Sequence, residues 1–453
     1  MKEYITVIGA GLAGSEAAIQ IAKAGIKVKL YEMKPYKFSE AHSNKNYAEI
    51  VCSNSFKSNL ITNACGLLKE ELRQLDSLLI KIADETAVPA GQALAVDREI
   101  FAQKVTEVLE ENENIQIINE EVTDIEELAK DGMVIIATGP LTSDGLAKDI
   151  QKITKKEGLY FFDAAAPIVT KESIDFNIAF YGDRYSQEKQ KNETIEEWEA
   201  RQSLEKKDYI NLPMTKEEYL DFYNELINAE VVELHSFEKN EIFEGCMPVE
   251  VMAKRGVDTL RFGPLKPVGF DDPRTNRRPY ALVQLRQDDK EARIFNLVGF
   301  QTNLKFSEQK RVFSKIPGLQ NAEFVKLGVM HRNTYINSSE LLDETFNFKD
   351  NENIFFAGQI SGVEGYVESI ASGLCAAKNA INKLNNKGKI TFSDVTMLGS
   401  LCKYISTPNK KFQPMNANFG ILKELEGNRI KDKKARYMAL AEISLDNIIK
   451  NKD

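Results

Sequence analysis

The first part of the chain alternates between short apolar runs and small residues, which predicts a strand, a turn, a helix and a second strand. The run YITVI at 4–8 is β-branched and apolar, and GAGLAG at 9–14 is rich in glycine. An alanine-rich stretch, SEAAIQIAKAG, and a second β-branched run, IKVKLYE, follow and end at Glu32. Apolar positions at helical spacing between two β-branched runs indicate a βαβ unit.

The glycine spacing in this unit predicts a dinucleotide site. Gly9 permits the tight turn, Gly11 lets the backbone approach a pyrophosphate at the helix N-terminus, and Gly14 lets helix and strand pack closely. Glu32 follows the glycines by roughly 20 residues, where a carboxylate accepts hydrogen bonds from ribose hydroxyls. Because strand, glycines, helix and acid occur in order, we interpret the segment as dinucleotide-binding rather than as a glycine-rich turn without a ligand.

Two later segments are predicted to join the same parallel sheet. GMVIIATGP at 132–140 and NIFFAGQISGVEGYVESIASG at 353–373 are apolar runs that end in glycine, a pattern typical of strands covered on both faces. This order resembles the glutathione-reductase-like FAD fold, in which the chain returns to the flavin domain near its C-terminal end. A helix N-terminus there favours an anionic flavin or a pyrophosphate. A second dinucleotide-binding unit without flavin is the alternative. The residues of the return segment expected to bind the cofactor are Gly358, Gln359, Gly362 and Gly365.

The region between these segments, 167–324, has a different sequence pattern, which predicts a second domain. A chain of 453 residues, 43% of them hydrophobic, is long enough for two cores. The expected fold class is therefore α/β: an FAD-binding Rossmann domain of the glutathione-reductase type, formed by 1–166 and 325–453, with an inserted α+β domain at 167–324. The charged run at 185–209 within the insertion is typical of an exposed helix or a flexible segment.

Composition narrows the class of protein further. Five cysteines without C-x-x-C spacing and a start without a charged-then-apolar leader predict free thiols in a reducing, cytoplasmic compartment. The apolar runs are much shorter than the roughly 20 residues of a membrane helix, so we expect no membrane association. Three scattered histidines offer no ligand set, so we expect no metal site.

Two of the cysteines lie among small polar residues rather than on an apolar face. They are Cys52, in VCSNSFKS, and Cys246, in GCMP. Gly245 and Pro248 make a helix interior improbable around Cys246, so a turn is predicted there. Two such thiols in one flavoprotein form either a redox pair or a nucleophile and a base. The other three, Cys65, Cys375 and Cys402, are interpreted as packing residues.

The net charge of −9 conceals local basic clusters, AKRGVDTLRFGPLKP at 253–267 and DPRTNRRP at 272–279. Such clusters are most simply solvated surface. If the substrate is RNA, they supply phosphate contacts, because Lys and Arg contacts to phosphates dominate affinity for nucleic acid. The phosphate-binding candidates are Arg255, Arg274, Arg277 and Arg278.

Blocks spread in order along nearly the whole chain resemble those of one family. They are VIGAGLAGSEAA, VCSNSFKS, LLKEELR, VPAGQALAVDRE, FEGCMPVEVMAKRG, RPYALVQLRQDD, VGFQTNL, GVMHRNTYINS, FFAGQISGVEGYVESIASG and FQPMNANFG. The chain resembles the folate- and FAD-dependent tRNA (uracil-5-)-methyltransferase family, TrmFO. It departs from the family pattern at Gln92, where glycine is usual, and at Leu212, where cysteine is frequent; neither departure touches the flavin glycines or the two thiols.

The resemblance implies a methyl transfer to C5 of a uridine in RNA. Methylenetetrahydrofolate supplies the carbon, FAD carries and reduces it, and NADPH or NADH supplies the electrons. Since C5 of uracil is a poor nucleophile, a thiolate first adds at C6. Cys246 matches the family's nucleophile, and His331 matches the histidine near the folate. Cys52 matches the second functional cysteine, which either removes the C5 proton or protects the flavin adduct.

The resemblance leaves the RNA open. A uridine of the tRNA T loop is the favoured substrate, and the same chemistry on 23S rRNA is the alternative, because close paralogues of the family methylate that RNA. Remoter alternatives are a flavoprotein that modifies the wobble uridine and a non-catalytic flavin-containing RNA-binding factor. No DNA partner is expected, and the sequence does not indicate an oligomeric state.

Overall fold

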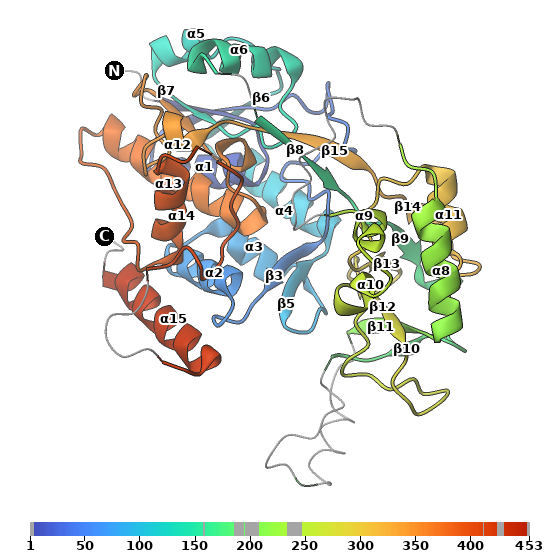
Figure 1. The fold of residues 1–453 in the computed structure, drawn as a ribbon. Helices are drawn as coiled ribbons and strands as arrows, with labels where there is room; N and C mark the ends of the chain where they lie inside the picture. Colours follow the sequence, from blue (N-terminus) through green and yellow to red (C-terminus); the bar gives the residue numbers. More distant parts are fainter. Residues whose placement is uncertain are drawn as a thin grey trace.

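A computed structural model describes residues 4–156, 159–184, 194, 208–232, 247–410, 412–423 and 430–450. Within these residues the two largest of four sheets, each with its own apolar core, lie side by side (Figure 1). The larger part contains both ends of the chain, and the smaller part is formed by the middle of the sequence. No helix among the described residues combines the length and apolar character that crossing a bilayer requires.

The larger part is built on a five-stranded sheet with strand order β16-β7-β1-β2-β6. Every neighbouring pair is parallel. Strands β7 and β16 are apolar throughout and buried, as is typical where helices cover both faces of a sheet. The strands are β1 (Tyr4–Ile8), β2 (Lys27–Tyr31), β6 (Ile115–Ile118), β7 (Met133–Ile136) and β16 (Ile354–Phe356).

Two helices from opposite ends of the sequence pack together on this sheet, α1 (Leu12–Lys23) and α13 (Tyr366–Leu384). Small residues allow the close contact: a Cβ on Gly373 would lie 2.2 Å from the Ala13 carbonyl oxygen. The strand at 354–356 thus enters the first sheet, as the sequence pattern predicted, and the helix that follows it packs on α1.

The remaining elements of the larger part surround this centre. A small antiparallel sheet has the strand order β3-β5-β4.

Cys65, Cys375 and Cys402 are buried in helices of this larger part, which confirms their interpretation as packing residues. The elements are β3 (Ser55–Ser58), β4 (Ala87–Val88), β5 (Ala93–Val96), α2 (Ala64–Gln74), α3 (Leu78–Glu85), α4 (Arg98–Glu110), α5 (Ile125–Asp131), α6 (Asp144–Thr154), α12 (Ser338–Leu341), α14 (Met397–Ser406), α15 (Lys433–Lys450) and a short 3-10 helix at Gln359–Ser361.

The smaller part is an antiparallel sheet covered by helices, with strand order β10-β11-β12-β13-β9-β14. Helix α8 begins at a capping box in which Thr215 and Glu218 each bond to the other's backbone N–H, as this sequence pattern favours. The elements are β9 (Ile168–Thr170), a 3-10 helix at Lys171–Ser173, β10 (Phe180–Tyr181), β11 (Tyr209–Met214), α8 (Lys216–Asn228), α9 (Val249–Lys254), α10 (Thr259–Phe262), β12 (Ala281–Gln287), β13 (Ile294–Leu297), α11 (Phe306–Phe313) and β14 (Phe324–Lys326).

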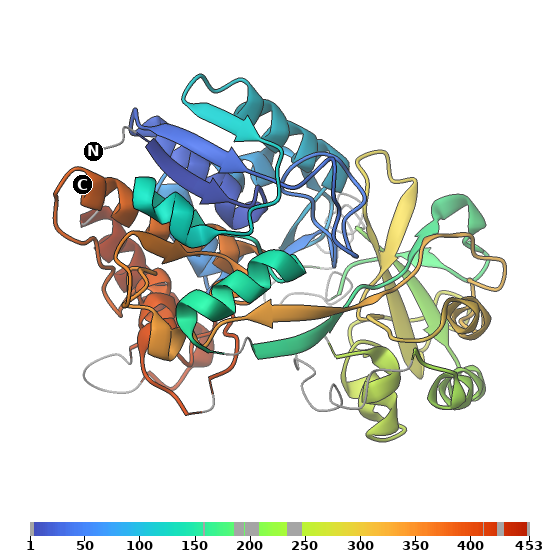
Figure 2. The same ribbon diagram turned by 90° about the horizontal axis from the view of Figure 1, so that it is seen from above.

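Two antiparallel strands connect the parts, β8 (Leu159–Ala164) and β15 (Met330–Tyr335). Figure 2 shows them running side by side between the two sheets. The predicted fold class, a parallel Rossmann-type sheet with an inserted α+β part, is confirmed. The ranges 1–166, 167–324 and 325–453 stay a prediction, and most of the charged run at 185–209 lies outside the described residues.

Candidate cofactor and cysteine site

A cavity with a volume of about 490 Å³ opens at the carboxyl ends of β1, β7 and β16. Doubly wound folds bind their ligands at this edge of a parallel sheet. The cavity is lined by segments that are far apart in the sequence: 9–13, 31–34, 51–53, 137–143 and 364–369. The predicted dinucleotide loop and the predicted cysteine loop therefore share one cavity.

The three glycines after β1 have different surroundings. Gly9 has a φ of +98°, and a Cβ there would lie 2.6 Å from the Ala137 carbonyl oxygen. A Cβ on Gly14 would lie 1.8 Å from the Gly9 carbonyl oxygen, so helix α1 can pack here only on glycine. By contrast, nothing lies within 4 Å of the Cβ position of Gly11. This open side, next to the uncapped N-terminus of α1, is where a pyrophosphate would fit.

Glu32 is fixed on the cavity wall beside these glycines. It is 9% exposed, and its Oε2 accepts a hydrogen bond from the Ala10 N–H at 2.8 Å. Its Oε1 accepts one from the Lys34 N–H at 3.1 Å. Since each carboxylate oxygen has a second lone pair, both can still accept from ribose hydroxyls.

The return segment forms the opposite wall. Gly358, Gly362 and Gly365 have φ values of +79°, +80° and +121°, a backbone region in which a Cβ is strained. Gly365 precedes α13, so the first turn of that helix lies at the cavity. These conformations suit the predicted role of the segment, and the assignment of its residues to the cofactor stays a prediction.

Two buried polar atoms on the cavity wall have no hydrogen-bond partner within the described part of the chain. They are the acceptor Glu368 Oε2 and the donor Asn333 Nδ2. Buried polar groups are normally paired, and an unpaired one needs an explanation such as an absent ligand. A flavin dinucleotide carries both donors and acceptors, so the cavity fits FAD in its glycine turns and in its unsatisfied polar atoms.

Cys52 lies on the loop between β2 and β3 and also lines the cavity. The N–H groups of Cys52 and Ser53 both donate to the hydroxyl oxygen of Tyr366, each at 3.1 Å. Tyr366 is the first residue of α13, so the cysteine loop is attached to the helix that borders the predicted flavin site.

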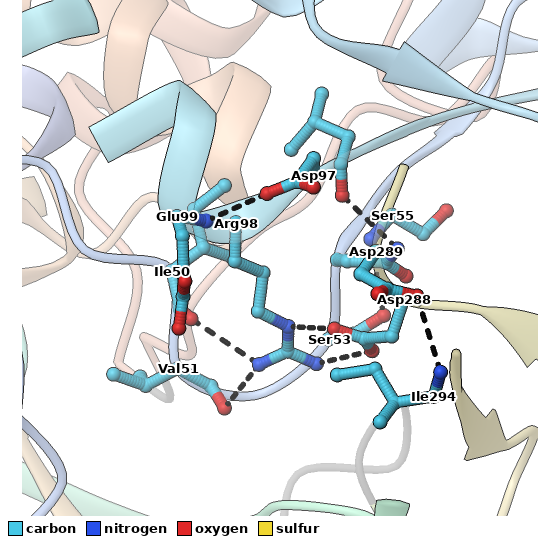
Figure 3. A network of polar contacts seen from close by, with 12 residues as sticks. Ile50, Val51, Ser53, Ser55, Asp97, Arg98, Glu99, Asp288, Asp289 and Ile294 are labelled. Atoms are coloured by element: carbon cyan, nitrogen blue, oxygen red, sulfur yellow. Dashed lines mark hydrogen bonds and ion pairs between the residues drawn. The ribbon is translucent and has the colours of Figure 1, made fainter. Parts of the chain in front are cut away.

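An arginine holds the other side of this loop (Figure 3). Nη1 of Arg98, the first residue of α4, donates to the carbonyl oxygens of Ile50 at 3.2 Å and Val51 at 3.0 Å. Its Nε and Nη2 donate to the carboxylate of Asp288 at 2.7 Å and 3.0 Å. Asp288 directly follows β12, so this contact joins the two parts of the molecule.

Two other predicted site residues, Cys246 and His331, are not fully described by the structure. Cys246 lies outside the described residues, so its distance from Cys52 stays untested. The backbone of His331 pairs with Asp163 between β15 and β8, but its side chain is also outside the description.

The four predicted RNA-binding arginines lie exposed on the smaller part. Arg274 differs from the others because its Nη2 forms an ion pair with Asp272 at 2.8 Å. The side-chain hydrogen bond to Asp272 raises the pKa of Arg274. Its guanidinium is therefore less available for a phosphate than those of Arg277 and Arg278.

Several residues of the cavity region were not predicted. For two of them, Arg286 and Asp288, the run LRQDD gives a signal, because charged residues there continue an apolar strand pattern. The remaining missed residues lie in helices and strands without any unusual sequence pattern, and only the tertiary structure brings their side chains to the cavity region. The missed residues are Arg98, Arg286, Asp288, Asn333, Tyr366 and Glu368.

The parallel sheet, the glycine turn, the acid after β2 and the return segment define a dinucleotide-binding protein of the Rossmann type with a flavoprotein topology. The model of the family described as glucose inhibited division protein A matches residues 4–388. Relatives named methylenetetrahydrofolate--tRNA-(uracil-5-)-methyltransferase TrmFO match almost the whole chain. That of Fusobacterium nucleatum is 55% identical over 98% of both chains, and that of Caldicellulosiruptor bescii is 56% identical over 98% of this chain and 97% of its own. The chain belongs to the glucose inhibited division protein A family and, within it, to the TrmFO family.

A solved structure shares the fold. GidA of Aquifex aeolicus aligns with a TM-score of 0.68 at 17% identity, covering 99% of this chain and 72% of that protein. At this identity the likeness shows the fold alone.

Proposed function

We propose that this protein is a methylenetetrahydrofolate- and FAD-dependent RNA methyltransferase that forms 5-methyluridine in tRNA. The observation that carries the proposal is the shared cavity: Cys52 and the predicted dinucleotide loop line the same space. The names of its relatives, which match nearly the full length, supply the substrate class and the carbon donor.

The residues of the chain suit the binding of FAD. Gly11 and the start of α1 would receive the pyrophosphate, since helix N-termini favour anions, and Glu32 would hold the ribose. Glu368 and Asn333 would pair their bare polar atoms with the bound cofactor. Bound FAD supplies the redox chemistry that converts a one-carbon unit into a methyl group.

The chain itself positions the thiol. Tyr366 and Arg98 fix the backbone on both sides of Cys52. Arg98 and Lys326 also interact electrostatically with Cys52. Cys52 is thereby suited to remove a proton from C5 of the uridine, while Cys246 adds to C6 as the nucleophile.

The remaining assignments rest on the family resemblance and the charge of the surface. We propose that His331 lies near the folate, that NADPH or NADH is the reductant, and that Arg255, Arg277 and Arg278 contact phosphates of the RNA. A cytoplasmic location follows from the proposed tRNA substrate. Methylation of 23S rRNA is the second candidate, because the family resemblance by itself does not separate the two RNAs.

One assay tests the function. The FAD-loaded protein is supplied with methylenetetrahydrofolate and NADPH, and unmodified tRNA and unmodified 23S rRNA are offered separately. We expect 5-methyluridine in the tRNA, measured by mass spectrometry of nucleosides, and none when the folate is omitted. Product in the rRNA alone would favour the second candidate, and product in neither RNA would contradict the proposal.

A further inference from the structure

The end of strand β12 holds the loop that carries Cys52, although the two lie on different parts of the molecule. Arg286 donates from Nη2 to the Ser53 hydroxyl at 2.6 Å and from Nε to the Asn54 side-chain oxygen at 2.9 Å. Asn54 in turn donates from Nδ2 to the Gln287 carbonyl oxygen at 2.9 Å. These bonds hold the two residues that follow Cys52.

The residue after this strand holds the other side of the loop indirectly. Asp288 binds the fork of Arg98, whose remaining nitrogen donates to the carbonyls of Ile50 and Val51 (Figure 3). The loop is therefore bonded on both sides of Cys52 to three consecutive residues of the smaller part: the backbone carbonyls before it through Arg98, and the side chains of the two residues after it directly.

The burial of Arg286 indicates that it does more than add stability. The residue is 8% exposed and lines the cavity. Within the described part of the chain it forms no ion pair; the nearby Asp288 carboxylate interacts with it electrostatically but is paired with Arg98. Burial lowers the pKa of Arg286, which reflects the unfavourable desolvation of its charge. A buried cation without an ion-pair partner of its own is costly for folding, and the side-chain hydrogen bonds that Arg286 forms with described residues go to the cysteine loop.

We propose that Arg286, together with Asp288 acting through Arg98, positions the Cys52 thiol, so that the inserted part of the chain completes the cysteine site. The proposal deepens the function proposed above and rests on it for its activity measurement. Its physical basis is that a loop between two strands keeps one geometry only if its backbone is held from several sides. A displacement of about 1 Å at a reacting group lowers turnover by roughly 100-fold.

Substitution of Arg286 by methionine tests this, because methionine keeps much of the apolar stem and removes both hydrogen bonds. Arg293→Met is the matched control: Arg293 lies just before β13, and its exposed guanidinium pairs with Asp289 and Glu291. For Arg286→Met we expect kcat to fall by about 10- to 100-fold while the KM for tRNA stays within about twofold. For the control neither value changes.

Hydrogen exchange of the peptide that covers 50–54 provides a second measurement that needs no RNA and no folate. In the FAD-bound protein, Arg286→Met should accelerate this exchange by about tenfold, because the amides of Cys52 and Ser53 lose the loop geometry that directs them at Tyr366. Arg293→Met should leave it unchanged. If the wild-type protein methylates no RNA, this measurement still tests the positioning role.

Ser53→Ala removes the same contact from the other side and serves if Arg286→Met fails to retain FAD. We expect a smaller fall in kcat, and a double variant no slower than Arg286→Met, since the Arg286–Ser53 bond is already lost in Arg286→Met. If Arg286→Met changes neither kcat nor the exchange, the inference is overturned and the proposed function still stands. Where Arg286→Met does not retain FAD, the same outcome in Ser53→Ala decides.

Discussion

The guanidinium of Arg98 and the carboxylate of Asp288 form a two-pronged ion pair across the boundary between the two parts of the molecule, at 2.7 Å and 3.0 Å. Both side chains are largely withdrawn from solvent. Removing one partner of such a pair leaves an uncompensated buried charge.

Asp288→Asn is therefore expected to lower the free energy of unfolding by about 3–5 kcal/mol, measured by urea denaturation. Arg73 and Asp84 form a pair of the same geometry on the surface, with both bonds at 2.8 Å. Because solvent screens that pair, Asp84→Asn should cost less than about 1 kcal/mol. Equal effects of the two substitutions would contradict the special role of the boundary pair.

Gly11→Ala and Gly14→Ala should separate cofactor binding from folding. The Cβ position of Gly11 is open, so its substitution should leave the melting temperature of the FAD-free protein unchanged and reduce the FAD bound after purification, because the methyl group occupies the space proposed for the pyrophosphate. The Cβ of Gly14 would meet the Gly9 carbonyl oxygen at 1.8 Å, so its substitution should lower the melting temperature itself. Full flavin absorbance in Gly11→Ala would count against the proposed pyrophosphate position.

Glu71 predicts a pH dependence of stability. Its buried carboxylate accepts the N–H groups of Met397 at 2.7 Å and Leu398 at 2.8 Å, at the start of α14, and the hydroxyl of Ser444 from α15. Burial raises its pKa from 4.5 to about 7. The folded state therefore binds this proton more tightly than the unfolded state does. The resulting stabilisation is complete below pH 4.5 and is lost as the pH rises to about 7.

The loss amounts to at most about 3 kcal/mol, at about 1.4 kcal/mol for each unit of pKa. Glu71→Gln cannot titrate, so the difference between its unfolding free energy and that of the wild type should vary across this pH range. Parallel curves for the two proteins would show that Glu71 does not titrate there.

The two candidate thiols can be tested separately. Cys52→Ala and Cys246→Ala should each reduce the formation of 5-methyluridine by about 100-fold or more, because each removes a reacting group. Both variants should retain FAD. Cys375→Ala is a suitable control, since that thiol is buried in α13. Undiminished methylation by both variants would exclude the proposed chemistry.

Arg277 and Arg278 should contribute to RNA affinity without affecting turnover. Replacing each by alanine is expected to raise the KM for tRNA and to reduce the salt dependence of binding by about one counterion for each residue. Arg274→Ala should have a smaller effect, because Asp272 already holds its guanidinium. An unchanged salt dependence in the Arg277 and Arg278 variants would place the RNA on another surface.

The sequence by itself determined most of the fold of the larger part and predicted the dinucleotide half of the candidate site. The roles predicted for Gly9, Gly11, Gly14 and Glu32 depend on backbone geometry within one βαβ unit, so near neighbours in the chain are enough to suggest them. The apolar runs at 133–136 and 354–356 likewise predicted strands buried on both faces, and both strands lie in the five-stranded parallel sheet.

Only the tertiary structure decided how Cys52 is held. Arg98 is separated from Asp288 by 190 residues, and Ser53 from Arg286 by 233, so no local pattern relates them. Their contacts exist because two separate sheets, each with its own core, lie against each other. The sequence specifies each sheet through periodicity, but the pairing of side chains across the boundary depends on the relative position of the two sheets in space.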